Sequence, residues 1–333
     1  MELSALDVVT ALAEHGPALG VEVSVAAHEA SKLPPGAGLV PVSLPDCPPT
    51  YANEGEGPRK WATVLGETRI QETLFGHARG FDLVHDHSHS ATSAGACRFL
   101  GVPLVRTVRL MPYHPAYVSS AATDTHRIYI SAYQREEDGW RGGRPSSVCY
   151  DRIPVSGRDG GEHVSERPFA LSIGRVEPRK GHHVAAALAR SAGLPLLVVG
   201  EVVQREYADA LVGQGGVEVA GPVDREEVGR LLRAARLLLW FPTSREPSGR
   251  VVIESLRAGT GVVGRPSGVL HDFVRSGHAH PYKGADDALD RLGWRAGAVR
   301  AERLPEWWPQ SAREVAAQHA GVYAGLLGTQ RRV

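Results

Sequence analysis

The chain has 333 residues, and its 37 basic and 37 acidic side chains give a formal net charge of zero. This length exceeds what one hydrophobic core usually serves, so it favours two domains of ordinary size. The balanced charge argues against nucleic acid or an anionic membrane surface as a partner, because binding to either usually requires an excess of positive charge. We therefore expect a small-molecule substrate.

The length of the apolar runs and the spacing of the cysteines indicate in which cellular compartment the protein lies. No run approaches the roughly 20 apolar residues of a membrane-spanning helix, and the first residues do not form a leader sequence. Cys47, Cys97 and Cys149 are widely spaced without a Cys-x-x-Cys pair, which is typical of buried thiols in a reducing compartment. We expect a cytoplasmic protein without a transmembrane segment. Nearly all its basic residues are arginine, as in proteins from GC-rich genomes such as those of actinobacteria.

Short β-branched runs alternate with segments of helical length, which is the pattern of parallel sheets covered by helices. The pattern restarts near residue 167, which indicates an α/β protein with two Rossmann-like domains. The expected strands are 21–25, 82–85, 104–108 and 127–131 in the first half, and 169–173, 196–199, 217–220, 237–241 and 261–264 in the second.

A polar, glycine-rich stretch at 156–162 has no apolar periodicity and is typical of a linker. We therefore place an N-terminal domain at 1–160 and a second domain at 161–306. Helical spacing predicts a last helix within 307–333, which either crosses back to the N-terminal domain or packs on its own domain. The region 33–60 is rich in proline and glycine, and we expect a long surface loop there.

The second half contains a strand, a glycine turn and a helix start in series, around 237–259. A helix start presents unpaired backbone N–H groups and the positive end of the helix dipole, so it suits phosphate oxygens. Glu246 and Glu254 flank this position. At about 1.5 Å rise per residue, Glu254 lies roughly 7 Å along the helix from Gly249, close to the span from a diphosphate to a ribose hydroxyl pair. Carboxylates accept hydrogen bonds from such hydroxyls. Two glutamates on a helix, however, more often belong to its solvent-exposed face.

A second glycine-bounded loop follows the expected strand 169–173 and contains Arg175 and Lys180. Phosphate that departs from a sugar gains negative charge, so fixed cations stabilise the transition state more than the ground state. Taken alone, a basic loop after a strand is usually an ordinary surface loop. The prediction of a phosphate site therefore depends on the agreement between the two loops.

These motifs occur in a fixed order, and in that order they resemble the family-4 retaining glycosyltransferases of the GT-B fold. The motifs are Gly174-Arg175…Lys180-Gly181, Gly221-Pro222-Val223 and Glu246-Pro247-Ser248-Gly249…Glu254-Ser255-Leu256…Gly259-Thr260. The resemblance covers roughly residues 167–276, and two glutamates separated by seven residues are its specific signature. It implies two Rossmann-like domains that face a cleft.

By this resemblance, Arg175 and Lys180 bind the donor pyrophosphate, Glu246 hydrogen-bonds the transferred sugar, and Glu254 holds the ribose. The backbone of Ser248, Gly249 and Arg250 contacts sugar and phosphate. Enzymes of this family need no metal and no cofactor, because protein cations and helix dipoles neutralise the phosphate. We expect a nucleotide-diphosphate sugar, with UDP as the commonest carrier.

Three histidines, His85, His87 and His89, alternate at the end of the expected strand 82–85. We expect their side chains to point to opposite faces, so a metal site is the less favoured interpretation. We expect a polar cluster on the acceptor side.

The segment after the strand 104–108 contains Arg109, Tyr113 and His114. Enzymes of the resembled family often have a histidine in place of Arg109, near the reacting carbon. Arg109 is accordingly either an acceptor or phosphate contact or a change that weakens the chemistry. Tyr113 is a candidate on the acceptor side, and His114 is either an active-site residue or an ordinary loop histidine.

The first nine residues resemble the helix that follows a first strand and a Gly-Gly loop in the family. That strand and loop are missing here, so either translation begins further upstream or the N-terminal domain lacks its first strand. A missing central strand would leave backbone groups unpaired, at a cost of several kcal/mol.

The function we expect is a retaining, metal-independent glycosyltransferase with a nucleotide-sugar donor and a small-molecule or glycan acceptor. One alternative is a catalytically weakened binding or partner subunit of the same fold. Another is a nucleotide-sugar epimerase, which would require acid and base carboxylates that we do not locate in the first domain. The oligomeric state, alone or with a partner subunit, stays open.

Overall fold

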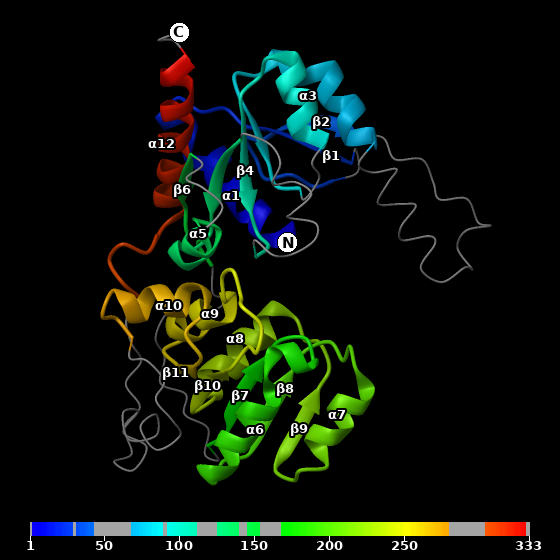
Figure 1. Ribbon diagram of the computed structural model, residues 1–333, viewed down its shortest axis with the longest axis vertical. Helices are drawn as coiled ribbons and strands as arrows, with labels where there is room; N and C mark the ends of the chain where they lie inside the picture. The colour runs from blue at the N-terminus through cyan, green and yellow to red at the C-terminus, as the bar shows by residue number, and fades with distance from the viewer. Residues whose placement is uncertain are drawn as a thin grey trace, which may run out of the picture. The chain divides into compact units, whose positions relative to one another are not determined.

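The computed structural model describes residues 2–28, 31–42, 68–88, 92–111, 125–139, 145–153, 168–279 and 304–330. The chain divides into two units (Figure 1). The first consists of Met1–Ile130, Gln134–Arg152 and Pro309–Val333, and the second of Ser131–Tyr133 and Ile153–Trp308. The long segment of the second unit thus begins at Ile153, whereas the expected boundary is at 161, and the expected linker 156–162 lies outside the described residues.

The first unit contains two separate parallel sheets. Four strands form one sheet in the order β3 (Val84–Asp86), β4 (Leu104–Val108), β5 (His126–Tyr129) and β6 (Ser146–Val148). A second sheet pairs β1 (Ser24–His28) with β2 (Gly38–Val42). All five residues of β4 are buried, as expected of an interior strand in a parallel sheet. β2 lies inside the region 33–60, so the prediction of a surface loop is wrong for residues 38–42.

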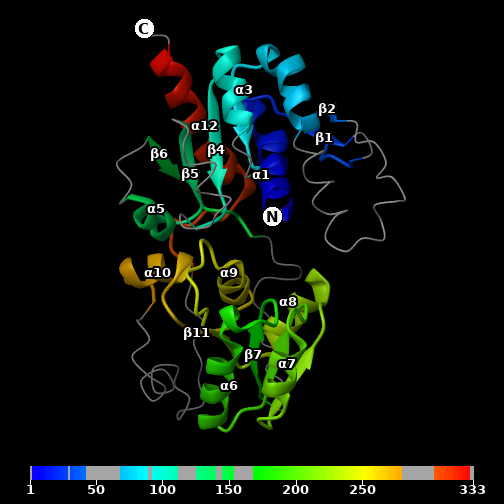
Figure 2. The same ribbon diagram turned by 45° about the vertical axis from the view of Figure 1, so that its right-hand side comes forward.

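Two helices from opposite ends of the sequence lie side by side in the first unit, α1 (Glu2–His15) and α12 (Ala312–Gln330) (Figures 1 and 2). Their apolar side chains share a core with Val105 of β4 and Ile128 of β5. Residues just before β1 and just before β3 also pack against this core. Further helical segments of the unit include η1 (Pro17–Leu19), residues 68–77, η3 (Ala78–Gly80) and α3 (Thr92–Leu100). α5 (Ala132–Gly139) begins in the segment assigned to the second unit.

The second unit has one parallel five-stranded sheet with helices on both faces (Figures 1 and 2). The strand order is β11 (Val262–Gly264), β10 (Leu237–Trp240), β7 (Ala170–Ile173), β8 (Leu196–Val199) and β9 (Val217–Ala220). The helices are α6 (His182–Ser191), α7 (Arg205–Val212), α8 (Arg225–Ala234), α9 (Arg250–Arg257) and α10 (Gly268–Arg275), with a 3-10 turn η4 (Pro178–Lys180) before α6. Among all described helices, none has the length and apolarity that crossing a lipid bilayer would take.

Strand order fixes where a ligand would bind in this sheet. The chain runs outward from β7 through β8 to β9 and then returns to the other side of β7 to form β10 and β11. The loops that follow β7 and β10 therefore leave neighbouring strands in opposite directions. In open parallel sheets, ligands bind outside the carboxyl ends of the strands at such a reversal.

Candidate functional site

The loop after β7 is held close to the loop after β10. It turns through η4 and reaches Gly181, whose φ of 71° lies in the left-handed region. A Cβ at Gly181 would lie 1.7 Å from the carbonyl oxygen of Phe241, which directly follows β10. The close approach of the two loops therefore requires glycine at this position.

His182 supports the backbone of the same loop from beneath. This side chain is buried, with Nε2 3.1 Å from the Arg175 carbonyl oxygen and Nδ1 2.8 Å from Ser172 Oγ. A carbonyl oxygen only accepts, so Nε2 donates to Arg175 and the Ser172 hydroxyl donates to Nδ1. Burial lowers the pKa of His182, which favours this neutral form.

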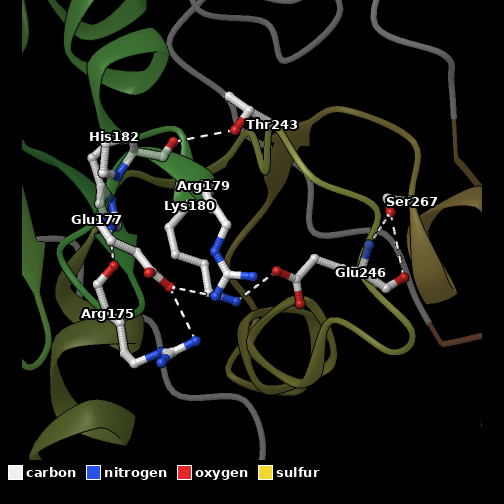
Figure 3. Close-up of polar contacts among 9 residues, drawn as sticks. Arg175, Glu177, Arg179, Lys180, His182, Thr243, Glu246 and Ser267 are labelled. Carbon is white, nitrogen blue, oxygen red and sulfur yellow. Dashed lines mark hydrogen bonds and ion pairs between the residues drawn. The ribbon is translucent and has the colours of Figure 1, made fainter. Parts of the chain in front are cut away.

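Five charged side chains gather at these two loops. Lys180 Nζ lies 2.6 Å from Glu246 Oε1, and each of the two side chains is about one-fifth exposed, at 23% and 19%. Glu177 Oε1 receives Nη2 of Arg175 at 3.0 Å and Nη2 of Arg179 at 3.1 Å. Figure 3 shows the Lys180 and Glu246 side chains directed toward each other and both arginines reaching Glu177. The structure thus brings Arg175, Lys180 and Glu246 together at these two loops, while the donor-binding roles expected for them stay predictions.

The loop that carries Glu246 is also fixed by the segment before α10. The Glu246 backbone N–H donates to Ser267 Oγ at 2.8 Å, and the Val269 N–H donates to the Ser248 carbonyl at 2.7 Å. These bonds hold the backbone on both sides of Pro247. No sequence motif pointed to Ser267.

α9 begins immediately after this loop with an open N-terminus. Its N-cap is Gly249, with φ of 89°, and no side chain of the described residues caps it. By contrast, Asp224 caps α8, where its Oδ1 accepts from the Glu227 N–H at 2.8 Å. The first turn of α9 therefore presents backbone N–H groups and a partial positive charge to an anion.

Arg250 and Glu254 are one turn apart on α9. Their Nε and Oε1 atoms are 3.9 Å apart, and the side chains are 26% and 20% exposed. Glu254 is therefore half-buried on the helix that starts at the glycine turn, rather than directed fully into solvent.

Two of the first-unit histidines, His85 and His87, do not point to opposite faces as we expected. The expectation that His85 and His87 point to opposite faces is wrong, since their ring centroids are 4.1 Å apart. Side chains two positions apart in an extended chain lie on the same side, which explains why His85 and His87 meet on either side of Asp86 in sequence. His89 lies outside the described residues. In the described part of the chain, no group of three or more side chains forms a metal-binding cluster.

His85 is held by hydroxyl groups on both sides. Its Nδ1 lies 2.7 Å from the Tyr323 hydroxyl on α12, and its Nε2 lies 2.7 Å from Thr107 Oγ1 on β4. His319 of α12 also stacks near His85, with ring centroids 5.7 Å apart. These contacts tie the last helix to the sheet of the first unit.

Arg109 makes a buried two-point ion pair. Its Nη1 and Nη2 lie 2.7 and 3.2 Å from the two carboxylate oxygens of Asp151, and the side chains are only 6% and 4% exposed. Both terminal nitrogens are thus engaged inside the first unit, and no sequence signal indicated Asp151. A catalytic or acceptor-side role of Arg109 stays a prediction, while Tyr113 and His114 lie outside the described residues.

The two parallel-sheet units have the architecture of the GT-B glycosyltransferases, and comparison with known proteins supports this. The structure of AviGT4, a glycosyltransferase involved in avilamycin A biosynthesis, is similar with a TM-score of 0.65 and 26% identity, over 97% of this chain and 89% of that chain. The structure of Anabaena Alr3699/HepE, in complex with UDP and glucose, has a TM-score of 0.60 over 98% of this chain and 92% of that chain. Its identity of 16% shows a common fold.

The second unit carries the family signature. Residues 158–291 match the family described as Glycosyl transferases group 1. The glycogen synthase of Halorhodospira halophila is 31% identical over 173 residues, which is 49% of this chain and 35% of that relative. The match therefore spans about a third of the relative's length.

Proposed function

We propose that the protein is a retaining glycosyltransferase that binds a nucleotide-diphosphate sugar on its second unit and transfers the sugar to an acceptor hydroxyl without a metal ion. The observation that carries this proposal is the ion pair between Lys180 and Glu246. It lies beside the uncapped N-terminus of α9, where the strand order of the sheet reverses. Cations and bare N–H groups suit the diphosphate, and a carboxylate suits the sugar hydroxyls. A small-molecule or glycan acceptor bound by the first unit is part of the proposal.

The chemistry follows from charge. The bond between the anomeric carbon and the phosphate oxygen breaks, and a bond from the acceptor oxygen forms on the same face of the sugar. The acceptor proton passes to the departing phosphate oxygen. Arg175, Lys180 and the first turn of α9 stabilise the negative charge that grows on that phosphate, which lowers the barrier because the interaction is stronger in the transition state.

We propose UDP-glucose as the first donor to test, because Alr3699/HepE was solved with UDP and glucose. A cytoplasmic location is also proposed, since Cys97 and Cys149 are buried free thiols.

The proposal is tested by incubating the protein with a panel of UDP-, ADP- and GDP-sugars and acceptor mixtures, with chelator present. We expect release of nucleoside diphosphate and, by NMR, a product with the anomeric configuration of the donor. Product of inverted configuration would refute retention, and transfer abolished by the chelator would refute metal independence. A changed sugar without acceptor would indicate an epimerase instead.

A second candidate is a binding subunit without turnover. The burial of Arg109 against Asp151 favours it, because the terminal donors of this arginine face a carboxylate of the same unit. Calorimetric binding of a nucleoside diphosphate without turnover of any donor would support this candidate over the enzyme.

A further inference from the structure

We infer that Arg179 is a third cation for the diphosphate and that Glu177 positions both Arg179 and Arg175. This inference rests on the proposed function. It deepens that function by assigning a binding role to Arg179 and a positioning role to Glu177, which the sequence motifs did not single out.

The geometry around Glu177 supports these roles. One carboxylate oxygen receives Nη2 of both arginines, at 3.0 and 3.1 Å (Figure 3). The Glu177 side chain is 9% exposed, whereas those of Arg175 and Arg179 are 51% and 57% exposed. A guanidinium has five N–H donors, so each arginine is anchored through one edge and keeps other donors directed to solvent. This arrangement orients two planar guanidinium groups, which can each bind two phosphate oxygens.

The backbone that carries Arg179 is joined to the segment that leads to Glu246. The Thr243 N–H donates to the Arg179 carbonyl at 2.9 Å, and the Thr243 hydroxyl donates to the Pro178 carbonyl at 3.2 Å. Thr243 is in turn held by Arg265, whose Nη1 donates to its carbonyl at 3.1 Å. Arg179 therefore starts from a fixed turn beside the Lys180–Glu246 pair rather than from a free loop.

The charges of this group leave room for an anion. Arg175, Arg179 and Lys180 supply three positive charges, and Glu177 and Glu246 supply two negative ones, so these five side chains sum to +1. Without Arg179 the sum would be zero. Arg179 therefore supplies the one positive charge by which this group exceeds neutrality, and that excess favours an anionic ligand.

The test is calorimetric binding of a nucleoside, its monophosphate and its diphosphate, in both the uracil and the adenine series. Arg179→Gln should weaken diphosphate binding about 5- to 30-fold, in line with the loss of a charge-assisted hydrogen bond, and leave nucleoside binding unchanged. Arg179→Lys, which keeps the charge without the fork, should lose less. The matched control is Arg190→Gln, which removes an arginine on α6 that bonds Gln214 and should leave all three affinities within twofold.

A double-mutant cycle tests the positioning role of Glu177. In a Glu177→Gln background, Arg179→Gln should cost less than threefold, because Arg179 is no longer held, whereas Arg190→Gln should remain additive. A full loss in that background would overturn the positioning role.

Failure of this inference and failure of the proposed function give different results. If the unaltered protein binds a diphosphate tightly and Arg179→Gln binds it equally well, the inference is overturned and the proposed function stands. If the unaltered protein binds diphosphates no better than nucleosides in either series, the proposed function fails and this inference fails with it.

Discussion

Glu246 and Glu254 differ in their surroundings, and this difference predicts different defects. Glu246 lies 2.6 Å from Lys180, while Glu254 lies 3.9 Å from Arg250 on the same helix. We expect Glu246→Gln to slow transfer roughly 10- to 100-fold, with little change in nucleotide affinity, because we propose that Glu246 hydrogen-bonds the transferred sugar. Glu254→Gln should weaken nucleotide binding about tenfold through the ribose. Steady-state kinetics and calorimetry on the same preparations measure both, and equal, negligible effects would remove the basis for the site.

Gly249 is a second residue whose replacement has a defined effect. Its φ is 89°, and a Cβ there would lie 3.0 Å from the Trp240 ring. Gly249→Ala should destabilise the second unit by about 1–2 kcal/mol and weaken diphosphate binding, because the start of α9 must shift. Gly213→Ala, at a φ of −60°, is the control. Melting temperatures and diphosphate affinities of the two variants decide the matter, and a Gly249→Ala protein equal to the control in both would contradict the prediction.

The positions of the site residues were predictable only in part. Arg175, Lys180 and Glu246 follow parallel strands, so their place at the carboxyl edge of a sheet follows from sequence order alone. Glu177 and Asp151 could not be assigned as partners in this way. The contacts that give them arginine partners depend on side-chain direction and, for Asp151, on a residue 42 positions away.

At the scale of elements, α12 depends on one polar contact as well as on apolar packing. The Tyr323 hydroxyl lies 2.7 Å from His85 Nδ1. Tyr323→Phe should lower the stability of the first unit by about 1–2 kcal/mol, because it leaves a buried nitrogen unpaired. Tyr207→Phe is the matched control, since the Tyr207 hydroxyl also bonds a histidine, His183, but at an exposed site. Urea unfolding compares the two, and an equal loss in both variants would contradict a special role of the buried contact.

The strands show which elements sequence patterns capture. β4, β8 and β9 have the predicted bounds, and β8 with four apolar residues in a row gives the clearest signal of a buried parallel strand. β1 begins three residues later than predicted, and β2 and β6 were not predicted at all. These three strands each pair on one edge in the described sheets, and their partly exposed residues give a weaker apolar signal.

At the scale of the molecule, the two separate sheets of the first unit predict uneven backbone protection. β1 and β3 each pair with one neighbour within the described chain, whereas β4 and β7 pair on both edges. Amide hydrogen exchange should therefore be faster in β1 and β3 than in β4 and β7, because opening an edge strand disrupts fewer contacts. Equal protection of β3 and β4, measured by mass spectrometry, would show that the free edge of β3 is covered in solution.

The buried histidines determine how stability changes with pH. Burial lowers the pKa of His85, His182 and His319, and burial together with the nearby Arg109 charge lowers that of His87 to about 3. The unfolded chain, in which histidines keep a pKa near 6.5, then binds more protons than the folded chain below that pH. Stability should be full above about pH 6.5 and fall on acidification, by up to about 1.4 kcal/mol per pH unit for each such histidine.

Urea unfolding at pH 7.5, 6.5, 5.5 and 4.5 measures this fall, and His87→Asn separates it from other acid effects. This variant removes one group that titrates only in the unfolded chain across that window, so its stability should depend less steeply on pH by up to about one proton. His77→Asn, at an exposed position, should leave the slope unchanged. If His87→Asn and the unaltered protein lost stability in parallel, His87 would have to be protonated in the folded state as well, which would contradict the lowered pKa of this residue.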